Sequence, residues 1–252
     1  MQVYHADPSL KGKLRRRLVR MQATRPAPAG PKRPMVSFSF DDAPSTAART
    51  GAGILESRGV RGTYFVSMGL AGQDGPMGRN MGPEEVRTLV ETGHEIGCHT
   101  HSHLDCGQAG GAAATDDVER NLEALLAAGA PKPATFAYPY GDVSAPAKAA
   151  LRGRFALLRA LHHGVIRRGS DLNQAPGVGI EGPGAEEVVR SWLRRTLADP
   201  GWLIIYTHDV REDHSAFGCT PGALTRLLDE ALQGGADVVT VAEGCRLLGV
   251  LR

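Results

Sequence analysis

From residue 35 onward, short apolar runs alternate along the chain with longer stretches in which apolar residues recur at helical spacing. Residues 35–40 alternate large apolar and small side chains, which predicts a β-strand, and the apolar run at residues 202–206 predicts a buried strand. Further strands are expected at residues 63–66, 94–98, 134–137, 155–158, 178–180 and 237–240. Helices are expected at residues 46–58, 83–92, 115–128, 185–197 and 221–232, followed by a helical tail.

Capping and breaking residues mark several of these helix ends. Pro83 occupies the first position of one helix, which stops before Gly93, and Thr115 is the expected N-cap of the next, which ends at Gly129. Regular strand–helix alternation builds a parallel sheet. About seven such units in about 220 residues fit a closed or nearly closed α/β barrel better than an open sheet. The first strand is not followed by a G-x-G-x-x-G motif, which weakens a dinucleotide-binding interpretation.

Composition limits the class of protein but does not indicate a function. The chain has 252 residues, of which 42% are hydrophobic and 22% charged, as in ordinary globular proteins. A formal net charge of +2 gives no reason to expect a nucleic-acid partner. No apolar run reaches the roughly 20 residues of a membrane-spanning helix.

The first 34 residues differ from the rest. Residues 11–20 are strongly basic and residues 25–31 are rich in proline, so we expect a basic arm and linker at 1–34 and one barrel domain at 35–252. The basic stretch is either a solvated helix or arm, or a contact for an acidic partner, a membrane surface or a phosphorylated substrate. Because no apolar core follows the basic start, the sequence predicts a cytoplasmic protein without a secretory signal.

Chemically versatile residues follow four of the predicted strands. Asp41 and Asp42 end the first strand, residues 99–103 follow the third, residues 138–141 follow the strand at 134, and His208 follows the strand at 202. The carboxyl ends of parallel barrel strands converge on one face, where active sites lie. Two imidazoles spaced i, i+4 and one carboxylate suit a divalent metal with open coordination positions, and a second carboxylate remains free to act as a base. The pattern therefore outlines a metallohydrolase.

These motifs resemble the NodB-homology polysaccharide deacetylases, carbohydrate esterase family four. The Phe-Ser-Phe-Asp-Asp segment at 38–42 and the histidine cluster at 99–103 carry the resemblance, which covers about residues 35–248. It implies a distorted (β/α)7–8 barrel and a metal-dependent hydrolase. It further implies that Asp42, His99 and His103 bind the metal, that Asp41 is the general base, and that His208 is the general acid. The metal is expected to be Zn²⁺, with Co²⁺, Ni²⁺ or Fe²⁺ also compatible with these ligands.

The resemblance also assigns a substrate groove. Residues 136–141 match the loop that lines it, so Tyr138, Pro139 and Tyr140 are expected to contact substrate, with the Tyr140 backbone N–H as the oxyanion donor. Asp171 is the candidate for the acidic residue that orients the general acid and is grouped with the groove.

Three positions depart from the family pattern. Ala43 replaces a glycine after the aspartate pair, Leu104 replaces a proline after the second histidine, and Ala137 replaces the groove-loop arginine that pairs with the base. We expect another cation to take the place of that arginine, with Arg152 or Lys148 as candidates.

The resulting function is removal of the acetyl group from an N-acetylated amino sugar in a glycan or glycan precursor, with release of acetate. Two alternatives stay open at this point: hydrolysis of a small non-sugar amide or imide on the same fold, and a catalytically silent carbohydrate-binding module.

Overall fold

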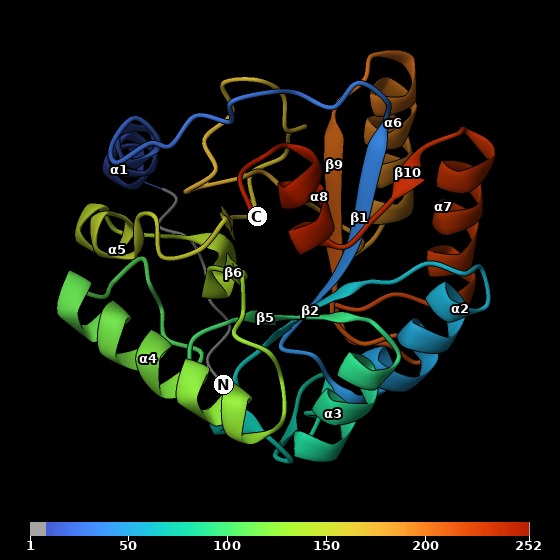
Figure 1. Cartoon of the computed structure of the whole chain (residues 1–252), viewed down its shortest axis with the longest axis horizontal. Helices are drawn as coiled ribbons and strands as arrows, with labels where there is room; N and C mark the ends of the chain where they lie inside the picture. Colours follow the sequence, from blue (N-terminus) through green and yellow to red (C-terminus); the bar gives the residue numbers. More distant parts are fainter. Residues whose placement is uncertain (1–8, 252) are drawn as a thin grey trace.

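A curled parallel sheet forms the centre of the computed structural model, which describes residues 9–251 (Figure 1). Its path runs β7-β6-β5-β2-β1-β9-β8, and β10 pairs separately with β1. The strands of this sheet are β1 (Met35–Asp41), β2 (Thr63–Val66), β5 (Glu95–Cys98), β6 (Thr135–Ala137), β7 (Leu157–Arg159), β8 (Val178–Gly179), β9 (Trp202–Thr207) and β10 (Asp237–Val238). All their pairings are parallel, which confirms the predicted α/β barrel as a distorted, open one.

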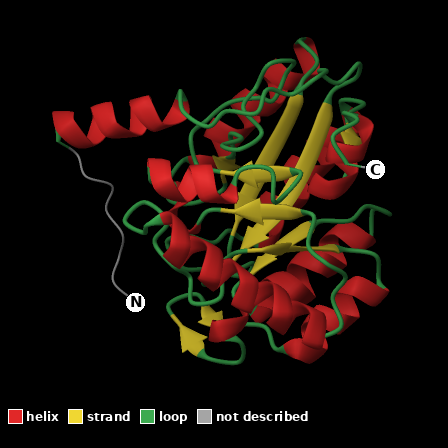
Figure 2. Cartoon of the chain, turned by 60° about the vertical axis from the view of Figure 1, so that its left-hand side comes forward, coloured by secondary structure: helices red, strands yellow, loops and turns green. Residues whose placement is uncertain are grey.

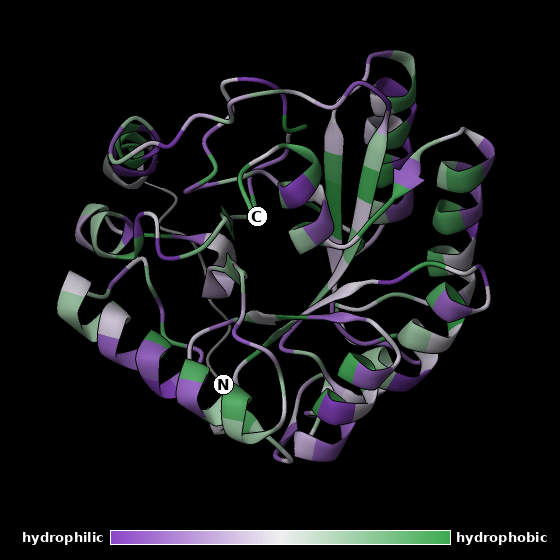
Figure 3. Ribbon diagram, viewed as in Figure 1, coloured by the Kyte–Doolittle hydropathy of each residue, from purple (hydrophilic) through white to green (hydrophobic). Residues whose placement is uncertain are grey.

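Helices surround the sheet (Figure 1). They are α2 (Ala52–Glu56), which follows a π-helical turn at Ala47–Gly51, α3 (Pro83–Glu91), α4 (Gly111–Ala127), α5 (Ala145–Leu151), α6 (Ala185–Ala198), α7 (Pro221–Gln233) and α8 (Val241–Leu247). Apolar residues dominate β1 and β9, and polar residues are frequent on the surrounding helices (Figure 3). The main core therefore lies between the sheet and its helical cover.

The alternation in β1 decides which residues face the core and which face the site. All seven residues of the strand are buried, and successive side chains of a strand point to opposite faces. Phe38 and Phe40 belong to the core that contains α7, and the Phe40 ring stacks on that of Tyr64 at 4.8 Å. Ser37 and Ser39 occupy the other face, where Ser39 donates to a β9 carbonyl. Asp41 lies two residues beyond Ser39, so its side chain points to the same inner face of the sheet as those of Ser37 and Ser39.

The register of β1 brings several strand ends to the same level. Phe40 pairs with Thr207 of β9, and Asp41 pairs with Phe65 of β2. Farther along the sheet, Ala137 at the end of β6 pairs with Arg159 at the end of β7. Polar residues that follow these strands are thus collected at one end of the barrel.

The N-terminal segment begins with α1 (Leu10–Arg20) and continues as a proline-rich stretch that packs on the barrel. Ala27 is buried and its N–H donates to the Ser170 carbonyl, while Leu172 donates to the Arg25 carbonyl. Residues 1–8 of the predicted arm lie outside the described residues. Within residues 9–251, no helix combines the length and the apolar character needed to cross a membrane.

Several elements differ from the sequence-based expectation. Helix α4 begins at Gly111, four residues before the expected cap, and the Thr115 hydroxyl donates back to the Gly111 carbonyl inside the helix. The expected strand at 155–158 is shifted and ends at Arg159. Helix α5 and a small hairpin of β3 (Asp74–Gly75) and β4 (Gly78–Arg79) were not expected, because their short segments lack a clear apolar period.

Candidate active site

Asp42, His99 and His103 form a compact buried group. The Asp42 Oδ1 atom lies 3.5 Å from His99 Nε2 and 3.1 Å from His103 Nε2. One ligand atom from each of the three residues lies within 4.8 Å of the others. The sequence therefore identified three residues that the fold brings together from two separate loops.

The loops reach this geometry through unusual backbone conformations. The non-glycine residues with positive φ among those described are Ala23, Asp42, Ala43, Thr100, His103 and Tyr140, and all but the first lie at this site. Non-glycine residues in this region cost about 1–2 kcal/mol each, and such residues cluster at functional sites. The expected glycine at 43 is thus an alanine held at φ 46°.

The i, i+4 spacing of the two histidines does not place them on a helix. Residues 99–104 form a loop with left-handed residues at Thr100 and His103. The Thr100 hydroxyl accepts the Leu104 N–H, which closes this turn. Both imidazoles then face Asp42 although the intervening backbone is irregular.

Asp117 of α4 holds the histidine loop in place. Its carboxylate accepts the backbone N–H groups of His101 at 2.7 Å and Ser102 at 2.9 Å, and the Ser102 hydroxyl at 2.9 Å. Burial alone would raise the pKa of Asp117, but these hydrogen bonds and the nearby Arg120 lower it below its ordinary value. A carboxylate from a neighbouring helix therefore fixes the middle of the turn between the two histidines.

The ring nitrogens of His99 have distinct environments. The Ala137 carbonyl lies 2.8 Å from Nδ1, so Nδ1–H donates to it and Nε2 faces Asp42 with its lone pair. Burial lowers the pKa of His99 to about 4, despite the nearby carboxylates. The imidazole is consequently neutral at pH 7, as a metal ligand must be.

The donor set fits a divalent cation. Asp42 Oδ1 and His103 Nδ1 are buried without a hydrogen-bond partner. Burial alone would raise the pKa of Asp42, but the hydrogen bond with the His103 side chain and electrostatic interactions with the neighbouring imidazoles lower it. A carboxylate that stays ionised beside two imidazoles, with an oxygen left unpaired, is the arrangement that a bound cation would complete.

Asp41 is fixed by an arginine that sequence reasoning missed. The Arg159 guanidinium pairs with both oxygens of the Asp41 carboxylate, and both side chains are buried. Arg159 also lies over the rings of Phe65 at 5.3 Å and Tyr206 at 4.8 Å. Because Arg159 is the register partner of Ala137, the cation absent from the groove loop is supplied by the neighbouring strand.

Neither cation suggested from the sequence has this role. Lys148 is buried and its ammonium contacts Asp171 at 2.7 Å and the Val19 carbonyl at 3.0 Å, whereas Arg152 is exposed. The sequence does contain one indication of this role. Arg159 directly follows the apolar run 155–158, so it lies at the end of a predicted strand, as the other site residues do.

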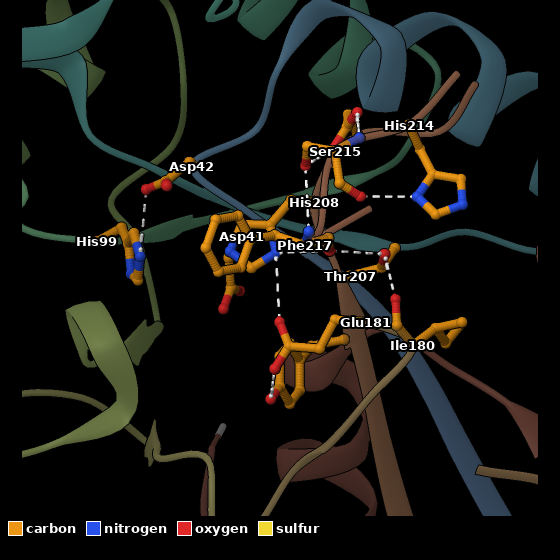
Figure 4. A network of polar contacts seen from close by, with 12 residues as sticks. Asp41, Asp42, His99, Ile180, Glu181, Thr207, His208, His214, Ser215 and Phe217 are labelled. Atoms are coloured by element: carbon orange, nitrogen blue, oxygen red, sulfur yellow. Dashed lines mark hydrogen bonds and ion pairs between the residues drawn. The ribbon is translucent and has the colours of Figure 1, made fainter. Parts of the chain in front are cut away.

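His208 directly follows β9, and Figure 4 shows its contacts with Phe217 and Glu181. Its Nδ1 is 3.1 Å from the Phe217 carbonyl and 3.9 Å from a Glu181 carboxylate oxygen. Donation of Nδ1–H to that carbonyl leaves Nε2 available on the other side of the ring. Buried Asp209 accepts the Ser215 N–H and hydroxyl, and so fixes the loop that carries Phe217.

Glu181, not Asp171, is the carboxylate next to His208. The Tyr206 hydroxyl donates to Glu181 Oε1 at 2.7 Å, which holds the second oxygen toward the imidazole (Figure 4). Asp171 instead accepts from Lys148 and from the backbone N–H groups of Arg25 and Asn173. It thereby ties the N-terminal segment to the barrel and does not orient His208.

The groove loop contributes one partly buried aromatic ring and two fully buried residues. The Tyr140 ring packs against the His103 ring with centroids 4.5 Å apart, and both line a cavity of about 380 Å³. Gln73 and Asn80 line the same cavity. Tyr138 is buried and its hydroxyl donates to the Asn173 carbonyl, so its ring is a packing element; Pro139 is buried too.

Comparisons with known proteins agree with this geometry. Residues 29–153 match the family model described as polysaccharide deacetylase, a segment that contains the three clustered residues and Asp41 and ends before His208. The chitin deacetylase from the fungal pathogen Colletotrichum lindemuthianum shares the fold with a TM-score of 0.63 and 23% identity, over 86% of this chain and 89% of that one.

Two further solved structures show the range of proteins built on this fold. A family 4 acetyl xylan esterase from Clostridium thermocellum, in complex with a cobalt ion, has a TM-score of 0.62 and 19% identity, over 86% of this chain and 93% of that one. A family 4 pseudoenzyme from Bacillus anthracis has a TM-score of 0.57 and 15% identity, over 88% of this chain and 68% of that one. With the fold and the matching segment in agreement, this chain is a hydrolase that belongs to the polysaccharide deacetylase family.

Proposed function

We propose that the protein is a metal-dependent de-N-acetylase that hydrolyses the acetamide of an N-acetylated amino sugar in a glycan or glycan precursor. The observation that carries the proposal is the buried Asp42–His99–His103 group with the Arg159-paired Asp41 beside it. A pseudoenzyme shares the fold, so the fold alone does not imply turnover. Joint retention of these residues and His208 supports catalysis over silent carbohydrate binding.

Asp42, His99 and His103 would hold the cation. When bound there, a divalent metal supplies Lewis acidity and makes a nearby water easier to deprotonate. Zinc suits one carboxylate and two imidazoles, and cobalt, nickel or iron could use the same ligands.

Asp41 accepts the proton of the attacking water in this scheme. Its carboxylate is held in one orientation by Arg159, so the acceptor oxygen needs no reorganisation when the water attacks the acetyl carbon. The oxygen of water forms the new bond to that carbon, and the other water proton stays on the acid product.

His208 gives a proton to the departing amine as the carbon–nitrogen bond breaks. The Phe217 carbonyl and Glu181 both lie on the Nδ1 side of the ring, which keeps a proton on Nδ1, so the proton transferred to the amine is the second one, on Nε2 of the doubly protonated ring, and the transfer leaves the ring neutral. An unprotonated amine anion is a very poor leaving group, so this transfer is essential for an amide. The Tyr140 N–H remains the candidate donor to the developing oxyanion.

Substrate contacts are proposed for the cavity beside His103. The Tyr140 ring offers an apolar face, while Gln73 and Asn80 offer amide groups to sugar hydroxyls. A related structure is a chitin deacetylase, which agrees with an amino-sugar substrate.

Acetate release tests the proposal directly. Purified protein is loaded with zinc and incubated with chitin oligosaccharides, acetylated xylan oligosaccharides and a cyclic imide, with Asp41→Asn as the matched inactive control. We expect acetate and new free amine from the chitin oligosaccharides alone, abolished by chelation. Metal-dependent turnover of the xylan ester or the imide in place of the amino sugar would contradict the substrate class, and no turnover of any acyl substrate would contradict the activity.

A further inference from the structure

Helix α1 exposes an apolar stripe that the catalytic proposal leaves unexplained. Leu10, Leu14, Leu18 and Met21 have exposed fractions of 84%, 57%, 48% and 74%. Among residues 9–251 the other large apolar side chains of comparable exposure are Leu126, Val188, Phe217 and Leu247. Those four lie on separate segments, so α1 carries the one cluster of this kind in the part of the chain that the structure describes.

The stripe points away from the barrel. At 3.6 residues per turn, the four exposed side chains fall within an arc of about 80°. Buried Val19 lies about 100–180° from each of them and faces the body. The Lys148 ammonium contacts the Val19 carbonyl at 3.0 Å, and Arg15 pairs with Asp142 at 3.4 Å. The helix is therefore attached by one side and projects from the molecule with the other (Figure 2).

Positive charges flank the stripe on both sides. Arg17 and Arg20 lie along one edge and Arg15 along the other, and all three are exposed. The helix contains no aspartate or glutamate. An apolar stripe flanked by arginines is complementary to a surface with anionic groups on the outside and apolar groups just below them. A bilayer with acidic headgroups is such a surface.

A second copy of this chain fits the stripe less well. Two α1 stripes packed face to face would bring their flanking arginines together without acidic residues on the helix to pair them. The remaining exposed apolar residues among those described are dispersed and offer no complementary patch.

We propose that α1 docks the protein onto a membrane surface that contains anionic phospholipid. The leucines enter the headgroup region, and Arg17 and Arg20 bind the lipid phosphates. Arg15 contacts Asp142, two residues beyond Tyr140, so docking through α1 holds the groove loop close to that surface.

Vesicle cosedimentation tests this docking without any turnover, so its outcome is separate from that of the proposed activity. The probes are phosphatidylcholine vesicles with and without phosphatidylglycerol. We expect binding to the anionic vesicles at least about tenfold tighter than to the neutral ones, and weaker binding at high salt.

Two pairs of variants identify the surface. Leu14→Ala with Leu18→Ala removes apolar area and preserves helix propensity, and should weaken vesicle binding at least about tenfold. Leu126→Ala with Leu247→Ala is the matched control, since these helical leucines have exposed fractions of 50% and 60%, and should bind as the wild type does. Arg17→Gln should weaken binding about fivefold, and the exposed Arg194→Gln should not.

Three results would overturn the proposal. The first is equal binding of the wild type to anionic and neutral vesicles, and the second is unchanged binding after Leu14→Ala with Leu18→Ala. The third is light scattering in which that double variant converts an oligomer to a monomer while vesicle binding stays unchanged, since the stripe would then cover a second copy.

Discussion

Replacing Arg159 by methionine removes the positive charge that faces Asp41 while preserving a long apolar side chain between Phe65 and Tyr206. Both partners of the ion pair are buried, with the Arg159 side chain fully inaccessible. The guanidinium contacts both carboxylate oxygens and two aromatic faces. The substitution therefore isolates the effect of an uncompensated carboxylate from that of a cavity.

The expected cost follows from this burial. Breaking a buried ion pair by removing one partner destabilises a protein by about 3–5 kcal/mol, because the other charge is left without compensation. In an Asp41→Asn background the remaining group is a neutral amide, so Arg159→Met should cost about 1–2 kcal/mol. The double-mutant cycle then gives a coupling of about 2–3 kcal/mol.

Urea denaturation of the metal-free protein, followed by tryptophan fluorescence, measures these free energies. Buried Trp202 lies in the core strand next to β1 and reports on its unfolding. Arg49→Met is the control, since Arg49 forms an ion pair whose arginine is 76% exposed, and should cost less than about 1 kcal/mol. A cost for Arg159→Met no larger than that of the control, or a coupling near zero, would refute the reasoning.

Three further substitutions test separate parts of the site. Asp117→Ala should destabilise the fold by about 3 kcal/mol at pH 7, because two backbone N–H groups and the Ser102 hydroxyl lose a charged acceptor. The pKa of Asp117 is depressed in the fold, so this difference in urea stability should shrink as the pH falls below about 4, and a pH-independent difference would contradict the assignment. Asp41→Asn should retain bound metal by elemental analysis and lose turnover by about 10²–10⁴-fold; full activity would reject Asp41 as the base. His208→Ala should slow acetate release by roughly 10²–10⁴-fold with metal content unchanged, and an unaltered rate would reject its role as acid.

Much of the candidate site was predictable because its residues lie at or just after strand ends, and the hydrophobic pattern of the sequence locates those ends. The end of a buried strand can be read from hydrophobic alternation, and parallel strands bring their carboxyl ends together. Asp41, Asp42 and His208 directly follow or end such strands, and His99 and His103 follow another.

The supporting residues depend on tertiary register, which one sequence does not reveal. Arg159 reaches Asp41 only because β7 pairs with β6 and ends level with Ala137. Glu181 approaches His208 through its bond to Tyr206, from a loop beyond β8. Asp171 was the candidate for the acidic residue that orients the general acid, and its hydrogen bonds to Lys148 and the N-terminal segment are equally invisible in the sequence.

The central claim is that Asp42, His99 and His103 bind a catalytic divalent cation, and elemental analysis after equilibration with zinc at pH 7 tests it most directly. The account predicts stoichiometric zinc in the wild type and in Asp41→Asn, with loss of the metal in Asp42→Ala and His103→Ala. A wild-type chain that remains free of metal in excess zinc, or an Asp42→Ala variant that binds zinc as the wild type does, would contradict it.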